Sequence, residues 1–245
     1  MRYFMKLSYN GANYHGWQIQ PNAITVQEVL QKAFTLILNE EIKIIGAGRT
    51  DTGVHAINFY AHFDISEKIN DIPRLVHKLN RFLKNDIAIH DIFRVKDDLH
   101  SRFSALSRTY EYRIHFQKNP FLHDRSFYVF EKLDFDKMNR AASLLFDYKD
   151  FTSFSKTHTD TKTNYCNIMR AEWIDGGEQK IFVIKADRFL RNMVRAITGT
   201  LFDVGRGKIT ENDFAKIIES KKRTEAGVSV PAHALFLTEI KYPGF

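Results

Sequence analysis

Residues Gly46-Ala-Gly-Arg-Thr-Asp-Thr-Gly-Val-His55 are the most informative stretch of this chain. An apolar run, Ile42 to Ile45, leads into it, and an alternating apolar run begins at Ile57. This order predicts a strand, a tight turn and another strand. The three glycines of the turn let the backbone bend sharply and approach a ligand closely. Asp51 lies at the tip, two residues from Arg49, which indicates a carboxylate held for chemistry rather than a solvated surface group.

Other interpretations of this turn compete with that one. The simplest is a strand connection with a surface ion pair. A phosphate-binding loop needs Lys and then Ser or Thr after its last glycine, but Val54 and His55 follow Gly53, so that interpretation fails. A dinucleotide-binding fingerprint fails because Asp51 stands where its third glycine belongs. Asp51-Thr-Gly53 also matches the aspartic-protease triplet. The chemistry of those proteases needs two carboxylates that share a proton. The chain has no second triplet, so only a homodimer would supply the second carboxylate.

Composition and charge indicate a globular protein with an anionic partner. The chain has 245 residues, 44% of them hydrophobic, which is enough for one large or two small domains. The net charge of +7 favours a polyanionic partner. We expect the single cysteine, Cys166, to be a small buried apolar residue in a reducing compartment. No signal peptide and no apolar run of roughly 18 residues is recognisable, so we expect a soluble cytoplasmic protein.

The predicted elements divide the chain into two similar halves. In the first half, alternation and capping signals predict strand, helix, strand, strand, helix and strand at residues 3–9, 25–38, 42–47, 57–64, 71–83 and 87–95. The second half repeats this order with one added helix, at residues 108–116, 134–146, 167–174, 180–186, 188–204, 210–221 and 235–242.

This order predicts an α/β (α+β) protein built from two tandem ferredoxin-like βαββαβ halves. We place the halves at residues 1–104 and 105–245, hinged near residues 99–107. We expect them to form a pseudo-duplicated sheet with a central basic cleft.

The predicted helix at residues 188–204 carries three arginines. Arg188, Arg191 and Arg195 recur at helical spacing, so we expect a basic ridge beside an apolar surface. A solvated helix face is the simpler alternative. Three arginines without a lysine favour phosphate or carboxylate binding, because guanidinium forks match the geometry of those anions.

Aromatic residues accompany the basic ones. Tyr14 and Trp17 lie in a glycine-broken loop, and Tyr110 lies on a strand next to arginines. Most aromatics should be core residues, but a few beside arginines could stack on a base withdrawn from its helix. No metal site is predicted, because the histidines do not cluster and strand alternation puts His55 and His62 on opposite sides.

Several motifs, in this order, resemble those of the tRNA pseudouridine synthase A family. The resemblance extends over essentially the whole chain. The matching motifs are Tyr9-Asn-Gly-Ala-Asn-Tyr-His-Gly-Trp-Gln18, Gly46–His55, Phe103-Ser-Ala105, Arg108-Thr-Tyr-Glu-Tyr112, Asp150-Phe-Thr-Ser-Phe154 and Phe189-Leu-Arg-Asn-Met-Val-Arg195.

The resemblance implies isomerisation of uridine to pseudouridine at positions 38, 39 and 40 of the tRNA anticodon stem-loop, by a homodimer without cofactor or metal. It implies that Asp51 is the nucleophile, that Tyr110 stacks on the target uracil and takes the C5 proton, and that Arg195 pairs with Asp51. It also implies that Arg49 contacts the RNA near the displaced base and that Leu235 packs against the pocket.

The chain departs from the family pattern in two places. The family usually has Gly where Ala234 stands, and the chain ends soon after Tyr242-Pro243. Neither position belongs to the groups that the resemblance assigns to chemistry.

The implied reaction suits a carboxylate. Moving the ribose from N1 to C5 needs a temporary covalent partner, and a carboxylate can act as nucleophile and as leaving group. Attack at uracil C6 and attack at ribose C1′ are both open. Extruding the base costs a few kcal/mol, which stacking and an inserted arginine would offset. The basic residues, Arg188 and Arg191 among them, would hold phosphates. A non-catalytic module that binds structured RNA is the alternative function, since it would need only the basic and aromatic residues.

Overall fold

The computed structural model describes residues 1–156 and 162–244. The chain divides into two compact units, unit 1 comprising residues 1–106 and 237–245 and unit 2 comprising residues 107–236. Helices and a multi-stranded sheet confirm the α/β class. Residues 237–245, which the sequence analysis placed in the second half, lie in unit 1. The duplication of ferredoxin-like halves stays a prediction.

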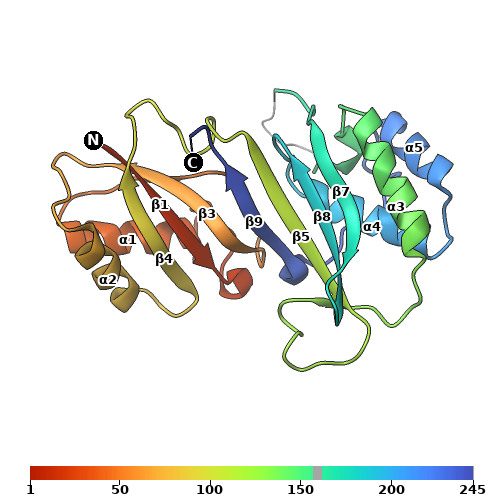
Figure 1. Ribbon diagram of the computed structural model, residues 1–245, viewed down its shortest axis with the longest axis horizontal. Helices are drawn as coiled ribbons and strands as arrows, with labels where there is room; N and C mark the ends of the chain where they lie inside the picture. Colours follow the sequence, from red (N-terminus) through yellow and green to blue (C-terminus); the bar gives the residue numbers. More distant parts are fainter. Residues whose placement is uncertain (157–161, 245) are drawn as a thin grey trace. The chain divides into compact units, whose positions relative to one another are not determined.

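Unit 1 has the predicted order of strands and helices. Its elements are β1 (Arg2–Tyr9), η1 (Gly11–Asn13), α1 (Val26–Leu38), β2 (Ile44–Gly46), β3 (His55–Asp64), α2 (Ile72–Phe82) and β4 (Ile87–Arg94), and most of β9 (Leu235–Lys241) joins them. β1 pairs antiparallel with both β3 and β4, and β2 pairs antiparallel with β3 (Figure 1).

The helix starts of unit 1 follow the sequence signals. The Thr25 side chain caps α1 by accepting the backbone N–H of Glu28 at 3.4 Å, while the Glu28 carboxylate pairs with Lys32. Asp71 caps α2 by accepting the backbone N–H of Arg74 at 2.9 Å, and Pro73 follows within the first turn.

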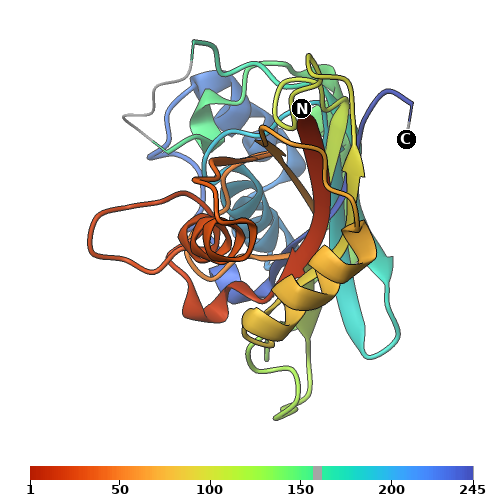
Figure 2. The ribbon, with the colours of Figure 1, turned by 90° about the vertical axis from the view of Figure 1, so that its left-hand side faces the viewer.

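The core of unit 1 lies between its sheet and the two helices, which pack against each other (Figure 2). The Phe34 ring of α1 meets the Phe63 ring of β3 edge-on, with centroids 4.9 Å apart. The opposite face of β1 is covered as well, because Tyr242 packs edge-on against Phe4 at 5.3 Å and Phe4 is fully buried. Both faces of β1 are therefore buried near Phe4. The alternating pattern of this strand predicted burial of one face only.

Unit 2 contains the strands β5, β7 and β8, which pair antiparallel, with helices packed beside them. Its elements are β5 (Ser107–His115), β6 (Phe127–Tyr128), α3 (Phe135–Ser143), η2 (Leu144–Asp147), η3 (Thr152–Phe154), β7 (Ile168–Asp175), β8 (Gln179–Ala186), α4 (Met193–Gly205), α5 (Glu211–Ser220) and η4 (Ala232–Ala234). β8 pairs with β5 and with β7, and the short β6 pairs parallel with β5. In the core, Phe202 of α4 contacts the rings of Trp173 and Tyr112.

The predicted helix at residues 188–204 is wrong at its start. α4 begins at Met193, and Asn192 before it has a left-handed backbone with φ of 68°. In the preceding segment, the Asp187 carboxylate accepts the backbone N–H of Arg188 at 2.7 Å and that of Asn167 at 2.8 Å. The predicted helical ridge therefore does not exist, since of its three arginines only Arg195 lies on α4.

No helix within residues 1–156 and 162–244 has both the length and the apolar character needed to cross a membrane.

A buried histidine lies on β3 of unit 1. His62 is 1% exposed, and its Nδ1 lies 2.7 Å from the Ser101 hydroxyl. Its Nε2 is buried without a hydrogen-bond partner among the described residues. Burial, together with the charges of Arg2 and His100, lowers the pKa of His62 from 6.5 to about 4.

We expect this histidine to make unit 1 acid-sensitive. Below pH 6.5 the unfolded chain takes up a proton that folded His62 does not take until about pH 4. The free energy of unfolding should therefore fall as the pH is lowered across this window, by up to about 3 kcal/mol. Denaturant titrations at several pH values should show this fall, and His62→Gln should make it shallower while His77→Gln, at an exposed position, leaves it unchanged. A His62 ring found protonated by NMR at pH 5.5 would contradict this expectation.

Candidate active site

The loop that carries Asp51 lies between β2 and β3 and packs against a second loop of unit 1, residues 10–17. The two loops approach backbone to backbone. A Cβ on Gly11 would lie 2.0 Å from the Val54 carbonyl oxygen, and one on Gly16 would lie 2.3 Å from that of Thr50. Side chains at these positions would push the loops apart, so the two motifs of the sequence analysis form one structural unit.

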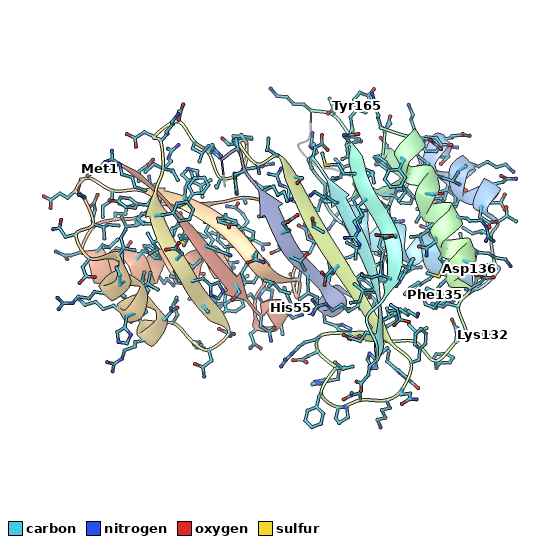
Figure 3. All side chains as sticks on the ribbon, in the orientation of Figure 1. Met1, His55, Lys132, Phe135, Asp136 and Tyr165 are labelled. Atoms are coloured by element: carbon cyan, nitrogen blue, oxygen red, sulfur yellow. The ribbon has the colours of Figure 1, made fainter. Side chains whose placement is uncertain are left out.

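Hydrogen bonds join the same two loops. The Trp17 N–H donates to the Thr50 carbonyl at 3.2 Å, and the Thr50 hydroxyl lies 2.9 Å from that of Tyr9. On the other side of Asp51, the Gly11 N–H donates to Nδ1 of His55 at 3.1 Å. His55, labelled in Figure 3, is 2% exposed at the start of β3. Asp51 is therefore carried by a loop that is anchored on both sides by buried groups.

The two charged residues of this loop differ in exposure. Asp51 is half-buried, and its backbone carbonyl accepts the Val54 N–H at 3.1 Å, which closes a tight turn. Arg49 is exposed. An anchored carboxylate beside an exposed guanidinium can present a nucleophile and a phosphate-binding group on one loop.

Tyr110 is half-buried on β5 of unit 2, where it pairs in register with Ile184 of β8. Its ring meets the Phe189 ring edge-on, with centroids 5.2 Å apart and planes at 89°. The sequence analysis placed Phe189 on a helix face, so this support of Tyr110 was missed. The strand pairing and the Phe189 contact limit the orientations open to the tyrosine ring.

Arg195 is half-buried in the first turn of α4. Its Nε donates to the Val230 carbonyl at 2.8 Å, and the Val230 N–H donates to the Arg195 carbonyl at 3.2 Å. Nearby, Asn192 donates to the Ser229 hydroxyl at 2.7 Å. The segment around Val230 therefore orients the guanidinium, a role that no motif in the sequence indicated.

The other predicted residues of unit 2 lie outside α4. Arg188 is half-buried in the extended segment before the helix, and Arg191 is exposed in the turn that follows. Leu235 is 5% exposed at the start of β9. Ala234, where the family pattern has Gly, is fully buried in η4, so its methyl group is accommodated.

Two aromatics proposed for base stacking belong to the core. Tyr14 is 4% exposed and donates its hydroxyl to Asp86 at 2.7 Å, while Trp17 is 1% exposed and packs on Phe59 at 4.2 Å. Cys166 is buried as expected, and burial raises the pKa of its thiol to about 12. Among the described residues, no three His, Cys, Asp or Glu side chains gather in a way that could hold a metal ion.

Comparison with known proteins identifies the family. The family profile described as "tRNA pseudouridine synthase" matches residues 6–104 and 141–243. A protein of Parabacteroides distasonis named "tRNA pseudouridine synthase A" is 53% identical over 242 residues, which cover 99% of this chain and 96% of the relative. One of the same name from Bacteroides fragilis is 54% identical over 243 residues, with coverage of 99% and 96%. Another, from Acetivibrio thermocellus, is 40% identical over 238 residues, covering 96% and 97%.

The chain belongs to the tRNA pseudouridine synthase family, and it is an enzyme of the isomerase class. The resemblance drawn from the motifs is thereby confirmed.

We expect the contact between the two loops of unit 1 to control both stability and activity. Gly11→Ala puts a methyl group against the Val54 carbonyl, so it should destabilise the fold by about 1–3 kcal/mol and lower activity. Gly48→Ala is the matched control, because a Cβ there meets nothing within 4 Å, and it should change stability by less than about 0.5 kcal/mol. Urea unfolding measures the stability of both variants. Equal effects of the two substitutions would show that the loops do not pack as described.

Proposed function

We propose that this chain converts uridine to pseudouridine at positions 38, 39 and 40 of the tRNA anticodon stem-loop, with Asp51 as the nucleophile. The single observation that carries the proposal is the nearly full-length likeness to proteins named tRNA pseudouridine synthase A. This likeness favours the enzyme over a non-catalytic RNA-binding module and over a dimeric aspartic protease.

The surroundings of Asp51 support its proposed role. A nucleophile must be held so that it meets the substrate without large losses of entropy, and this loop is tied to its neighbour by close backbone contacts and buried hydrogen bonds. Asp51 is also half-buried rather than sealed in the core, so a nucleoside can reach it.

The proposed reaction balances without a co-reactant. Asp51 forms a covalent bond with the nucleoside, the N1–C1′ bond breaks, the uracil turns, and a C5–C1′ bond forms. C5 then loses its proton, N1 gains one, and Asp51 departs unchanged. We assign the stacking on uracil and the removal of the C5 proton to Tyr110.

Arginines complete the proposed substrate contacts. Arg195 is assigned as the charge-balancing guanidinium, and Arg49 as the group that contacts the RNA near the displaced base. We assign Arg188 and Arg191 to the binding of backbone phosphates, because one guanidinium group can donate two parallel hydrogen bonds to a phosphate. Leu235 is assigned as an apolar wall of the uracil pocket. We further propose a homodimer in the cytoplasm, which sedimentation of the purified protein and fractionation of cells would test.

The test of this function uses Asp51→Asn, which keeps the size of the side chain and removes the nucleophile. We expect pseudouridine formation to fall by at least about a thousandfold, while tRNA binding persists. Unmodified tRNA is incubated with the protein alone, and carbodiimide-dependent reverse-transcription stops then map the modified positions.

Asp91→Asn is the matched control, since it removes the same charge from an exposed position on β4 of unit 1. It should retain wild-type activity. Normal turnover by Asp51→Asn would rule out Asp51 as the nucleophile. Stops outside positions 38–40 would place the target elsewhere in the tRNA.

A further inference from the structure

Helix α2 and the turn after it concentrate the positive charge of the chain. Residues 72–84 contain four Lys or Arg and no Asp or Glu, whereas the whole chain has a net charge of +7. This one segment therefore has a net charge of +4. None of the family motifs of the sequence analysis includes it.

The cations of this segment share one exposed face. Arg74, Lys78 and Arg81 follow each other at spacings of four and three residues, which places them in one row along the helix. Lys84 lies just beyond the last turn, and all four residues are exposed. The opposite face is anchored in the core by apolar residues, among them Leu75, Leu79 and Leu83.

Among residues 1–156 and 162–244, no acidic side chain pairs with these four cations. Among the described residues, none of the four side chains makes an ion pair, and the contact of Arg74 with Asp71 uses the Arg74 backbone N–H. Like charges at these spacings repel each other. Arg74 also lies in the first turn, where the helix dipole disfavours a cation. The repulsion between these cations therefore destabilises α2, and a bound polyanion would reduce that repulsion.

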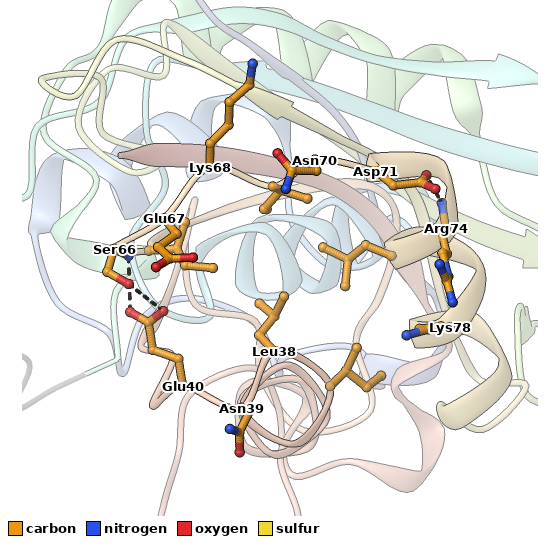
Figure 4. A pocket seen from close by; sticks show the side chains of 14 residues that line it. Leu38, Asn39, Glu40, Ser66, Glu67, Lys68, Asn70, Asp71, Arg74 and Lys78 are labelled. Atoms are coloured by element: carbon orange, nitrogen blue, oxygen red, sulfur yellow. Dashed lines mark hydrogen bonds between the residues drawn. The ribbon is translucent and has the colours of Figure 1, made fainter.

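A pocket of about 820 Å³ borders this face (Figure 4). Arg74 and Lys78 lie side by side on one wall, and Glu40 and Glu67 lie on the other. Glu40 is engaged with Ser66, whose backbone N–H and hydroxyl lie 3.1 and 2.9 Å from its two carboxylate oxygens. The acidic wall disfavours a phosphate inside the pocket, so an anion fits along the helix instead.

We propose that the cationic face of α2, formed by Arg74, Lys78, Arg81 and Lys84, binds the phosphate backbone of the tRNA. This inference rests on the proposed function, because the anion is taken to be the substrate RNA. From Arg74 to Arg81 the helix rises about 10 Å, so the row is long enough to contact more than one phosphate of a strand. Such contacts position the RNA without reading its sequence.

The test removes three of these cations with Arg74→Gln, Lys78→Gln and Arg81→Gln in one variant of the full chain. Glutamine keeps a good helix propensity, so α2 should persist. The dissociation constant for an unmodified tRNA transcript is measured against salt concentration. The magnitude of the logarithmic salt slope should fall by about 2–3, and KM should rise on the order of tenfold or more at 0.1 M salt.

Two readouts separate binding from a structural role. The rate at saturating tRNA should stay at the wild-type value, because no substituted residue is assigned to the chemistry. The melting temperature should stay equal or rise, because the substitutions remove like-charge repulsion.

The matched control removes the same charge where each cation already has a carboxylate partner. Lys137, Arg170 and Lys180 pair with Asp134, Glu172 and Asp175 at 3.6, 2.6 and 2.8 Å. Replacing these three residues by glutamine should change the salt slope by less than about 1.

The possible outcomes separate tRNA binding by α2 from a contact with a second copy and from the proposed function. An α2 variant with wild-type salt slope and KM overturns the inference, and so does a control variant that weakens binding equally. A change in oligomeric state without a change in tRNA binding also overturns it, because the face would then contact a second copy. If the wild-type protein forms no pseudouridine but its binding still depends on α2, the proposed function fails while the inference stands.

Discussion

The carbonyl oxygens of Thr50 and Val54 lie so close to Gly16 and Gly11 that no side chain fits between the two loops of unit 1. This steric constraint explains why sequence elements more than 30 residues apart form one support for Asp51. The hydrogen bonds from Gly11 and Trp17 close the same contact. The Asp51 carboxylate therefore lies on a loop that is anchored by contacts on both sides of it.

Much of the fold was predictable because local signals agreed with tertiary packing. The strand β1 and the caps at Thr25 and Asp71 depend on nearby residues, and the structure confirms that strand and both caps. The start of α4 was not predictable in this way. The apolar spacing continues back to Phe189, but the left-handed backbone at Asn192 interrupts the helix, and Asp187 binds the backbone N–H groups of Arg188 and Asn167 before it. Both are contacts or conformations that periodicity does not reveal.

The residues of the candidate site also divide into those that the sequence predicted and those that it did not. Asp51 and Tyr110 stand out because motifs with unusual chemistry surround them. The residues that support Tyr110 and Arg195 were less visible. Phe189 and Val230 are ordinary apolar residues, and their importance comes from the ring contact of Phe189 with Tyr110 and from the two hydrogen bonds of the Val230 backbone with Arg195. The cationic face of α2 was overlooked for another reason. Its residues form no motif, and only the helical geometry and the exposure of the residues bring them into one row.

The membership of residues 237–245 in unit 1 has a consequence for how the protein is made. Tyr242 covers Phe4 and donates its hydroxyl to the Ser101 carbonyl at 2.5 Å, so it completes packing around strands that precede unit 2 in the chain. Until residues 237–245 have left the ribosome, that side of β1 has no Tyr242 to shield it. The apolar surface at Phe4 therefore stays without this cover while all of unit 2 is synthesised. An exposed apolar surface favours aggregation, so a chaperone would be most useful during this interval.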